Sequence, residues 1–320
     1  MVKRKIIKGL AGLFIILFII DVIASFYFYD LAISRGPKDF LSGNKDLEVS
    51  AETMDVLLEG GWRDWVADQE FEYMEMTSRD GLLLQGYFLE AKKPTNKLVI
   101  AAHGYLGRGS DMGLYGQYYY EELGYNFFTA DSRGHGKSEG NYYGFGWPDR
   151  LDYVDWIQLL INKLGPDTEI ILHGLSMGAG TVLMTAGEEL PDNVKVVIAD
   201  SPYTSVHDLF SYQIDRMFNL PAFPFIHSTS LLTKARAGYS FKEASALEQV
   251  KKAKVPILYI TGNGDTFVPT EMTHELYEHT KSKAELVTFD GANHGESFVM
   301  DEARYKQVLN TFLKDNLDNE

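Results

Sequence analysis

One stretch, Ile170 to Gly180, constrains the fold of this chain more than any other. An apolar run typical of a buried strand ends in Gly-x-Ser-x-Gly, and a segment with helical character follows. Between a strand and a helix, this motif predicts a tight turn that holds a serine in a strained conformation with its hydroxyl exposed. Gly174 and Gly178 fit that turn because any side chain would collide where strand and helix nearly touch. Ser176 is therefore the predicted nucleophile, and an idle serine in a glycine-rich turn is the alternative.

The segments on both sides of this motif alternate between strand and helix patterns. Strands are expected at 97–102, 126–130, 194–199, 256–261 and 286–289, with a hairpin at 71–77 and 82–89, and helices at 112–123, 151–164, 270–280 and 299–317. Strands that alternate with helices predict an α/β fold, in which a mostly parallel twisted sheet is covered by helices on both faces.

One segment, 203–250, interrupts the alternation and is too long for a simple crossover. Pro221 and Pro224 break any long helix within it. The segment is rich in aromatic residues, which predicts a small helical cap over the carboxyl ends of the strands. Its aromatic side chains either line an acyl pocket or pack the cap on the core.

The amino terminus departs from the composition of the rest of the chain. Lys3, Arg4, Lys5 and Lys8 precede an apolar run from Leu10 to Ile20, which continues from Val22 to Tyr29 after Asp21. About twenty apolar residues span a bilayer as a helix, and their insertion outweighs the cost of about 3 kcal/mol for Asp21 near mid-membrane. We therefore expect a membrane anchor at 1–31, a connector at 32–69, and a catalytic domain at 70–320 that contains the cap.

The basic cluster predicts that the amino terminus stays in the cytoplasm and that the rest of the chain lies outside the membrane. Phe26 to Tyr29 would then form an aromatic belt at the far interface. A cleaved signal peptide is the competing interpretation, because Val22-Ile23-Ala24 resembles a cleavage site. Under either interpretation the domain is exported, as a single-pass membrane protein or in secreted form.

Composition excludes several kinds of chemistry. The chain has 320 residues, a net charge of −15 and no cysteine. The acidity argues against nucleic acid as a partner, since nucleic-acid binding requires a basic face. The lack of cysteine excludes disulfides, thiolate metal sites and a cysteine nucleophile. No cofactor and no metal ion is expected.

A serine hydroxyl needs a neighbouring base, and His294 is the best candidate among eight histidines. It lies in a glycine-flanked loop between the last strand and the last helix, a position that carries function in open α/β sheets. The other histidines are expected to be structural or solvated: His173 on a buried strand, His135 in a turn, His207 and His227 in the cap, and His274 and His279 on a surface helix.

The imidazole in turn needs an acid, and Asp265 is the first choice. It follows the strand at 256–261 in a glycine-containing loop, and the chain order Ser, Asp, His fits this kind of sheet. Asp200, which also ends a strand, is the rival, and Asp290 is a third choice. Backbone N–H groups of Met177, next to the serine, and Tyr105, after the strand at 97–102, are the expected oxyanion hole.

Together these residues resemble the α/β-hydrolase superfamily from about Phe71 to the carboxyl terminus. The resemblance rests on His103-Gly104, the run from Asp131 to Gly140, Gly174–Gly178, Gly262–Pro269 and Asn293-His294-Gly295. The Asp-x-Arg-Gly-His-Gly-x-Ser run is similar to that of monoacylglycerol lipases, serine aminopeptidase-like proteins and bacterial membrane-anchored hydrolases. The resemblance implies that Asp131, Arg133 and His135 support the loop beneath the nucleophile.

The sequence thus predicts a metal-independent serine hydrolase that cleaves short- to medium-chain acyl esters or monoacylglycerol-like lipids. A serine aminopeptidase acting on short peptides is the nearest alternative, and cap residues Asp208, Asp215 and Glu243 are the carboxylates available to receive a substrate ammonium. A catalytically silent hydrolase fold that serves as a binding module is a third possibility.

Overall fold

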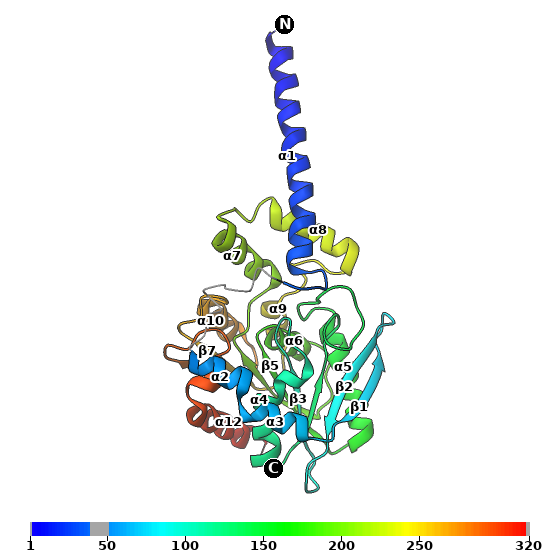
Figure 1. The fold of residues 1–320 in the computed structure, drawn as a ribbon, viewed down its shortest axis with the longest axis vertical. Coiled ribbons are helices and arrows are strands. Elements are labelled where there is room, and N and C mark those ends of the chain that lie inside the picture. Colours follow the sequence, from blue (N-terminus) through cyan, green and yellow to red (C-terminus); the bar gives the residue numbers. More distant parts are fainter. Residues whose placement is uncertain (1, 39–50, 318–320) are drawn as a thin grey trace.

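An eight-stranded sheet forms the centre of the computed structural model, which describes residues 2–38 and 51–317 (Figure 1). The strand order is β1-β2-β4-β3-β5-β6-β7-β8. β2 pairs antiparallel with β1 and β4, and all other neighbours are parallel. The strands are β1 (Glu72–Thr77), β2 (Leu83–Leu89), β3 (Lys97–Ala102), β4 (Asn126–Ala130), β5 (Glu169–Leu175), β6 (Val194–Asp200), β7 (Ile257–Gly262) and β8 (Ala284–Phe289). The carboxyl ends of the parallel strands therefore meet at one edge.

Helices cover both faces of the sheet, as the alternating sequence pattern predicts. One face packs against α5 (Asp149–Leu164), α6 (Met177–Ala186), α9 (Ala246–Val250) and α10 (Thr270–His279). The other packs against α2 (Ala51–Glu59), α3 (Gly61–Asp68), α4 (Gly113–Gln117), α11 (Ser297–Met300) and α12 (Glu302–Leu317). Central strands covered on both faces are mostly apolar, which is why β3 and β5 are nearly continuous apolar runs.

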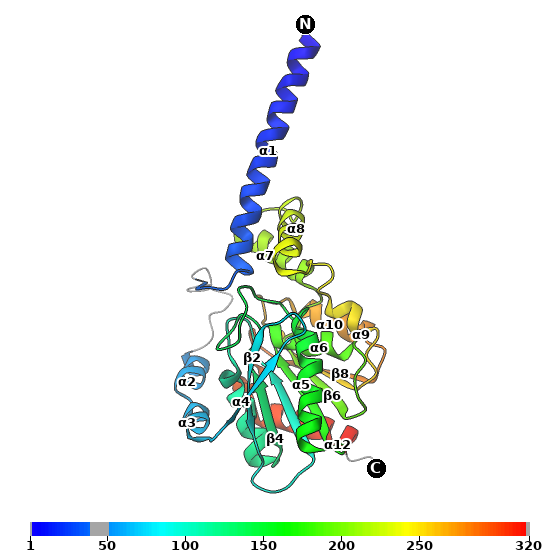
Figure 2. The same cartoon turned by 90° about the vertical axis from the view of Figure 1, so that its right-hand side faces the viewer.

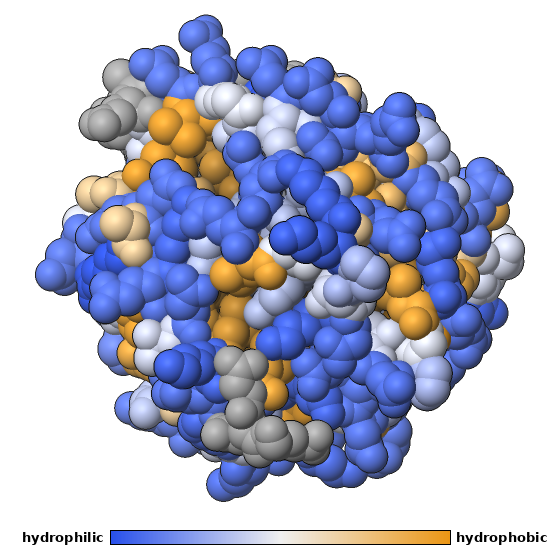
Figure 3. All heavy atoms as spheres, turned by 90° about the horizontal axis from the view of Figure 1, so that it is seen from below, coloured by the Kyte–Doolittle hydropathy of each residue, from blue (hydrophilic) through white to orange (hydrophobic). Residues whose placement is uncertain are grey.

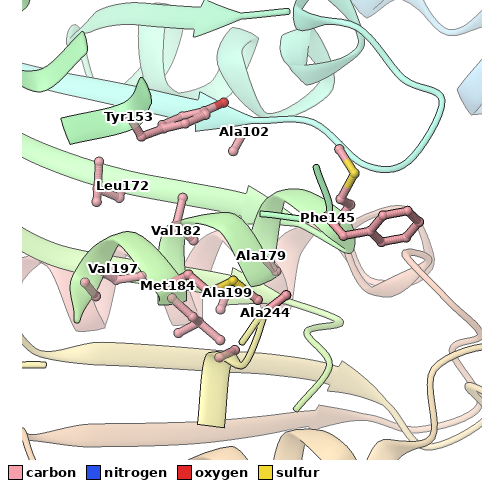
Figure 4. Close-up of a cluster of buried hydrophobic side chains, with 14 of the residues drawn as sticks. Ala102, Phe145, Tyr153, Leu172, Ala179, Val182, Met184, Val197, Ala199 and Ala244 are labelled. Carbon is pink, nitrogen blue, oxygen red and sulfur yellow. The ribbon is translucent and has the colours of Figure 1, made fainter. Parts of the chain in front are cut away.

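Side chains of the central strands alternate between the two cores. In β3, Leu98 and Ile100 belong to the core under α5 and α6, whereas Val99 and Ala101 face the side of α4 and α12. Figure 4 shows part of the first core, where Val182 of α6 lies close to Leu172 of β5. These residues are fully buried. This packing fixes the position of α6, and with it the turn that precedes α6.

Two cap helices, α7 (Val206–Phe218) and α8 (Phe225–Ala237), are inserted between β6 and β7. α1 (Val2–Ala32) projects from the body as a long single helix, and α7 and α8 flank its carboxyl-terminal end (Figures 1 and 2). Among the described residues, only the stretch Lys3–Ala32 is both long and apolar enough to cross a membrane. The expected cap and the expected apolar terminal helix are both present.

Two predicted helices differ in the structure. The predicted helix at 112–123 is wrong as a single element: a 3₁₀ turn η3 (Gly109–Met112), α4 and a π turn η4 (Tyr118–Glu122) replace it. The glycines in this segment have a low helix propensity. Gly113 also packs closely, because a Cβ at this position would lie 2.1 Å from Val66. The predicted helix at 299–317 divides at Asp301, whose carboxylate accepts the Arg304 N–H and begins α12. Residues 39–50 of the expected connector lie outside the described residues.

We predict that Gly178→Ala destabilises the protein, because a Cβ at this position would lie 2.0 Å from the Ala102 carbonyl oxygen. Relieving that overlap requires α6 to move away from β3, which costs about 2 kcal/mol or more. The thermal unfolding midpoint of the detergent-solubilised protein should fall by about 5 °C or more. Gly61→Ala is the matched control because nothing lies within 4 Å of its added Cβ, and an equal midpoint for both variants would contradict the prediction.

Candidate active site

Ser176 occupies the sharp turn between β5 and α6. Its backbone has φ 55° and ψ −115°, a conformation that is costly for a residue with a side chain. The turn is this tight because Gly174 and Gly178 allow the backbones to touch: a Cβ on Gly174 would lie 2.2 Å from the Gly178 carbonyl oxygen. This tight turn places the Ser176 hydroxyl at the carboxyl edge of the sheet, as the motif predicts.

The loops after β7 and β8 bring Asp265 and His294 to this serine. His294 Nε2 lies 2.7 Å from Ser176 Oγ, and His294 Nδ1 lies 2.7 Å from Asp265 Oδ2. Ser176 and His294 are 118 residues apart in sequence. With Nδ1–H donated to Asp265, Nε2 accepts the serine proton, which is the arrangement that activates a hydroxyl nucleophile. The structure therefore brings together the three residues predicted as nucleophile, base and acid, whose catalytic roles stay predictions.

Asp265 is held in place by its own loop. Its Oδ1 accepts the backbone N–H groups of Phe267 at 3.0 Å and Val268 at 2.8 Å, which leaves Oδ2 for the imidazole. The Asp265 side chain is fully buried, whereas that of His294 is 10% exposed. A carboxylate fixed in this way determines both the tautomer and the orientation of the ring.

The pKa of His294 is raised above its ordinary value, although burial by itself lowers it. The negative charge of Asp265, the hydrogen bond to Asp265 and the more distant charge of Asp200 together outweigh burial. The neutral imidazole is the form that accepts a proton from Ser176. Activity should therefore fall as the pH decreases through this raised pKa.

Asp200, the predicted rival, does not bond the imidazole. Its carboxylate accepts Tyr305 Oη at 2.9 Å and Ser201 Oγ at 3.0 Å inside the buried core, and burial raises its pKa to about 6. The Asp200 carbonyl oxygen instead accepts the N–H of Ser176 at 2.8 Å. Asp200 thus supports the turn and adds charge behind His294. Asp290 bonds Asn263 on the exposed side of the loop, away from the imidazole.

The expected oxyanion donors flank the serine. Met177 is the first residue of α6, where a backbone N–H has no intrahelical acceptor. Tyr105 lies in the loop after β3, and both residues line the same cavity as Ser176. The close approach of this loop to the nucleophile is visible at Gly104, where a Cβ would lie 3.6 Å from the Ser176 Cβ. The two amides remain predicted donors.

The remaining histidines have other partners or face solvent. His173 lies between Tyr119 Oη and Tyr305 Oη, and burial lowers its pKa to about 3, so it stays neutral. His103 accepts the Ser132 N–H, and His135 packs beside it in the core. The other four belong to α7, α8 and α10, away from Ser176.

The run from Asp131 to Gly140 forms a densely bonded loop. Arg133 donates to Asp152 and Asp80, and its side chain is 3% exposed. Asp131 accepts bonds from Tyr87 Oη and from the N–H groups of Gly109 and Lys137. These bonds agree with the support role that the resemblance implies.

A cavity lies directly beside Ser176. It measures about 840 Å³ when the solvent-filled space of its open mouth is included. Its lining is almost entirely apolar and comes from the cap, the loops after β3 and β7, and α1. No aspartate or glutamate is among the described residues that line it. Among the described residues, no cluster of histidine and carboxylate side chains could hold a metal ion.

Comparisons with known proteins agree with this architecture. The family described as serine aminopeptidase, S33, matches residues 93–220, and the family described as serine hydrolase (FSH1) matches residues 157–294. The esterase Pf2001 of Pyrococcus furiosus superposes with a TM-score of 0.63 at 25% identity, over 79% of this chain and 95% of that one. The chain is an α/β-hydrolase of the serine hydrolase superfamily.

Two curated relatives of this serine hydrolase cover most of its length. The uncharacterized protein YqkD of Bacillus subtilis is 29% identical over 256 residues, which cover 78% of this chain and 83% of that protein. Lysophosphatidylserine lipase ABHD12 of Danio rerio is 24% identical over 241 residues, which cover 71% of this chain and 61% of the lipase.

Sequence reasoning missed one part of the hydrolase site, the end of α1. Phe28, Leu31 and Ala32 line the cavity beside Ser176, and Tyr29 is buried against the cap. The expectation that Phe26 to Tyr29 form a simple belt at the interface is therefore incomplete. The only available signal was that apolar and aromatic residues continue past Asp21.

We predict that Asp265→Asn and Asp200→Asn have different effects on ester hydrolysis. Asp265→Asn should lower kcat by about 10⁴-fold, because the imidazole loses the partner that fixes its tautomer. Asp200→Asn should retain turnover but move the acid limb of kcat/KM to lower pH, because removing a nearby negative charge lowers the pKa of His294.

The pH profiles of both variants and the wild type, measured with p-nitrophenyl acetate, check this prediction, with thermal unfolding as the control for folding. Loss of turnover in a folded Asp200→Asn protein and its retention in Asp265→Asn would reverse the assignment.

Proposed function

We propose that this serine hydrolase cleaves carboxylic esters of short- to medium-chain acyl groups, including monoacylglycerol-like lipids, through an acyl-enzyme intermediate. Ser176 is the nucleophile, His294 the general base and acid, and Asp265 the residue that orients the imidazole. The observation that carries the proposal is the apolar cavity that Ser176 helps to line, together with the hydrogen-bond distance between Ser176 Oγ and His294 Nε2.

The reaction follows from these positions. Ser176 Oγ attacks the ester carbonyl while His294 Nε2 takes the hydroxyl proton, and the N–H groups of Tyr105 and Met177 bind the oxyanion. The bond to the leaving group breaks as His294 returns the proton to the departing alcohol. Water then attacks the acyl-serine with His294 again as base, releasing the carboxylic acid and restoring Ser176.

The lining of the cavity favours an acyl chain over a peptide amino terminus. A substrate ammonium requires a carboxylate in the pocket, and the three cap candidates lie elsewhere. Asp208 accepts bonds from Ser205 and Thr204, Glu243 is paired with Lys234, and Asp215 is exposed on α7. A desolvated ammonium in an apolar cavity would lack a partner, which is costly.

The comparisons support the same reaction class. One relative is named a lysophosphatidylserine lipase and one structural neighbour an esterase. Acylaminoacyl peptidases are also among the structural neighbours, at 20% identity, and share the fold. A silent binding module would not need an imidazole between the elbow serine and a buried carboxylate, so the geometry disfavours it.

We further propose that α1 is an uncleaved, single-pass anchor that places residues 70–320 outside the cytoplasmic membrane, with residues 32–69 as the connector and residues 203–250 as the cap. The basic residues at its start support this orientation. The alternative cleavage site, at Val22–Ala24, falls inside a continuous helix whose next residue, Ser25, is buried. Cleavage there would cut through a packed element.

A panel of p-nitrophenyl esters and aminoacyl p-nitroanilides tests the reaction class. The wild type should hydrolyse the esters, and Ser176→Ala should lose about 10³-fold or more of kcat while the thermal unfolding midpoint changes little. Ser211→Ala is the matched control because Ser211 lies on α7, where its hydroxyl bonds the His207 carbonyl. Release of p-nitroaniline without ester hydrolysis would favour the aminopeptidase instead, and ester turnover that survives Ser176→Ala would refute the mechanism.

A further inference from the structure

The carboxyl-terminal half of α1 is bound along the cap. Ser228 of α8 donates a hydrogen bond to Asp21, and the Arg236 guanidinium lies 4.9 Å from the Phe26 ring. Phe28 packs edge-on against Phe218 and Phe225, with ring centroids 5.3 Å and 6.1 Å apart. The helix that precedes Asp21 is exposed among the described residues. The part of α1 before Asp21 therefore projects from the body, and the part from Asp21 onward packs on the cap.

The end of α1 is also fastened to the loops of the catalytic domain. Tyr105 Oη donates to the Ala32 carbonyl at 2.8 Å, which links the helix end to the loop of the predicted oxyanion donor. The next residue, Ile33, is fully buried. Arg35 then donates to the carbonyl oxygens of Gly136, Ser138 and Gly140. These bonds hold α1 in a defined position over the site, as expected of a structural element and not of a flexible tether.

The same end of α1 forms a wall of the apolar cavity. Phe28, Leu31 and Ala32 face it, together with Phe210, Ile214 and Met217 of α7 and Ile226 of α8. Tyr105 and Phe145 complete the side near Ser176. An acyl chain attached to Ser176 would therefore lie between the cap and the last turn of α1.

The length of α1 indicates where the membrane ends. From Leu10 to Ile20 the exposed apolar helix measures about 17 Å, at 1.5 Å per residue. The hydrocarbon core of a bilayer is about 30 Å thick. The rest of that thickness is therefore spanned by the residues of α1 after Asp21, which the cap flanks. Asp21 is sheltered there by Ser228.

The exposed side chains of the cap are consistent with that depth. Phe223 and Leu231 are 70% and 74% exposed, and large apolar side chains at such positions suit the edge of a bilayer. The face of the molecule opposite α1 is mostly hydrophilic, with only scattered apolar patches (Figure 3).

We propose that the last turns of α1 are part of the acyl-binding site, and that the substrate is a single-chain acyl lipid that passes into the cavity from the outer leaflet of the membrane holding α1. This inference rests on the proposed ester hydrolysis and on the proposed anchor. α1 then has two roles: it holds the enzyme at the membrane, and it shapes the pocket for the chain that the membrane supplies.

A substitution in the α1 wall, which consists of Phe28, Leu31 and Ala32, tests whether α1 is part of the acyl-binding site. Leu31→Trp should partly fill the cavity, and it should lower the ratio of kcat/KM for p-nitrophenyl decanoate to kcat/KM for p-nitrophenyl acetate by about 10-fold or more. Ile19→Trp is the matched control, because Ile19 is exposed on the free part of the same helix. The full-length protein is used in detergent micelles.

The outcomes separate this inference from the proposed function. If the wild type does not hydrolyse acetate through Ser176, the proposed function fails. If it does, but Leu31→Trp and Ile19→Trp keep the wild-type ratio of decanoate to acetate, the α1 wall is refuted.

Fluorescence quenching tests the source of the chain. Phe223→Trp, reconstituted in phosphatidylcholine vesicles with brominated acyl chains, should show quenching beyond that of the wild type, because bromine quenches only indoles near the hydrocarbon. Tyr73→Trp is the control, since Tyr73 is 65% exposed on the edge strand β1. Equal quenching in the two variants would mean that the cap does not reach the membrane and would overturn entry from the bilayer.

Discussion

The hydrogen bond between Ser176 Oγ and His294 Nε2 is the contact on which the rest of the arrangement depends. It exists because two independent constraints meet at one edge of the sheet. Gly174 and Gly178 let the elbow close and lift the serine, and the loop after β8 brings in the imidazole. Parallel strands place their carboxyl ends side by side, so residues far apart in sequence become neighbours. Asp265, held by two backbone N–H groups, then fixes the ring.

Much of this arrangement could be predicted from sequence because its signals are local. Gly-x-Ser-x-Gly after an apolar strand specifies the elbow, and glycine-flanked polar residues after the last strands specify the partners. Sequence alone left Asp200 open as a rival to Asp265, because both follow buried strands. Only the fold shows that the Asp200 side chain turns into the core toward Tyr305, whereas Asp265 faces the imidazole.

The parts that sequence did not reveal depend on contacts between distant segments. The helix predicted at 112–123 is divided into η3, α4 and η4, and Gly113 at the start of α4 passes close to Val66 of α3, a contact that no local pattern encodes. Similarly, the sequence shows the cost of Asp21 in a membrane helix but not its partner, Ser228, which lies 207 residues later and donates a hydrogen bond to it. The α1 wall of the cavity is of the same kind, because Leu31 lies outside every motif that marks the site.

Covalent labelling reports directly whether His294 activates Ser176 as a nucleophile. The intact protein is treated with a fluorophosphonate and its peptides are mapped by mass spectrometry. We expect a single adduct, on Ser176, and we expect the folded His294→Ala variant to form it at least 100-fold more slowly. Absence of any adduct on Ser176, or equal labelling rates in the two proteins, would contradict this expectation.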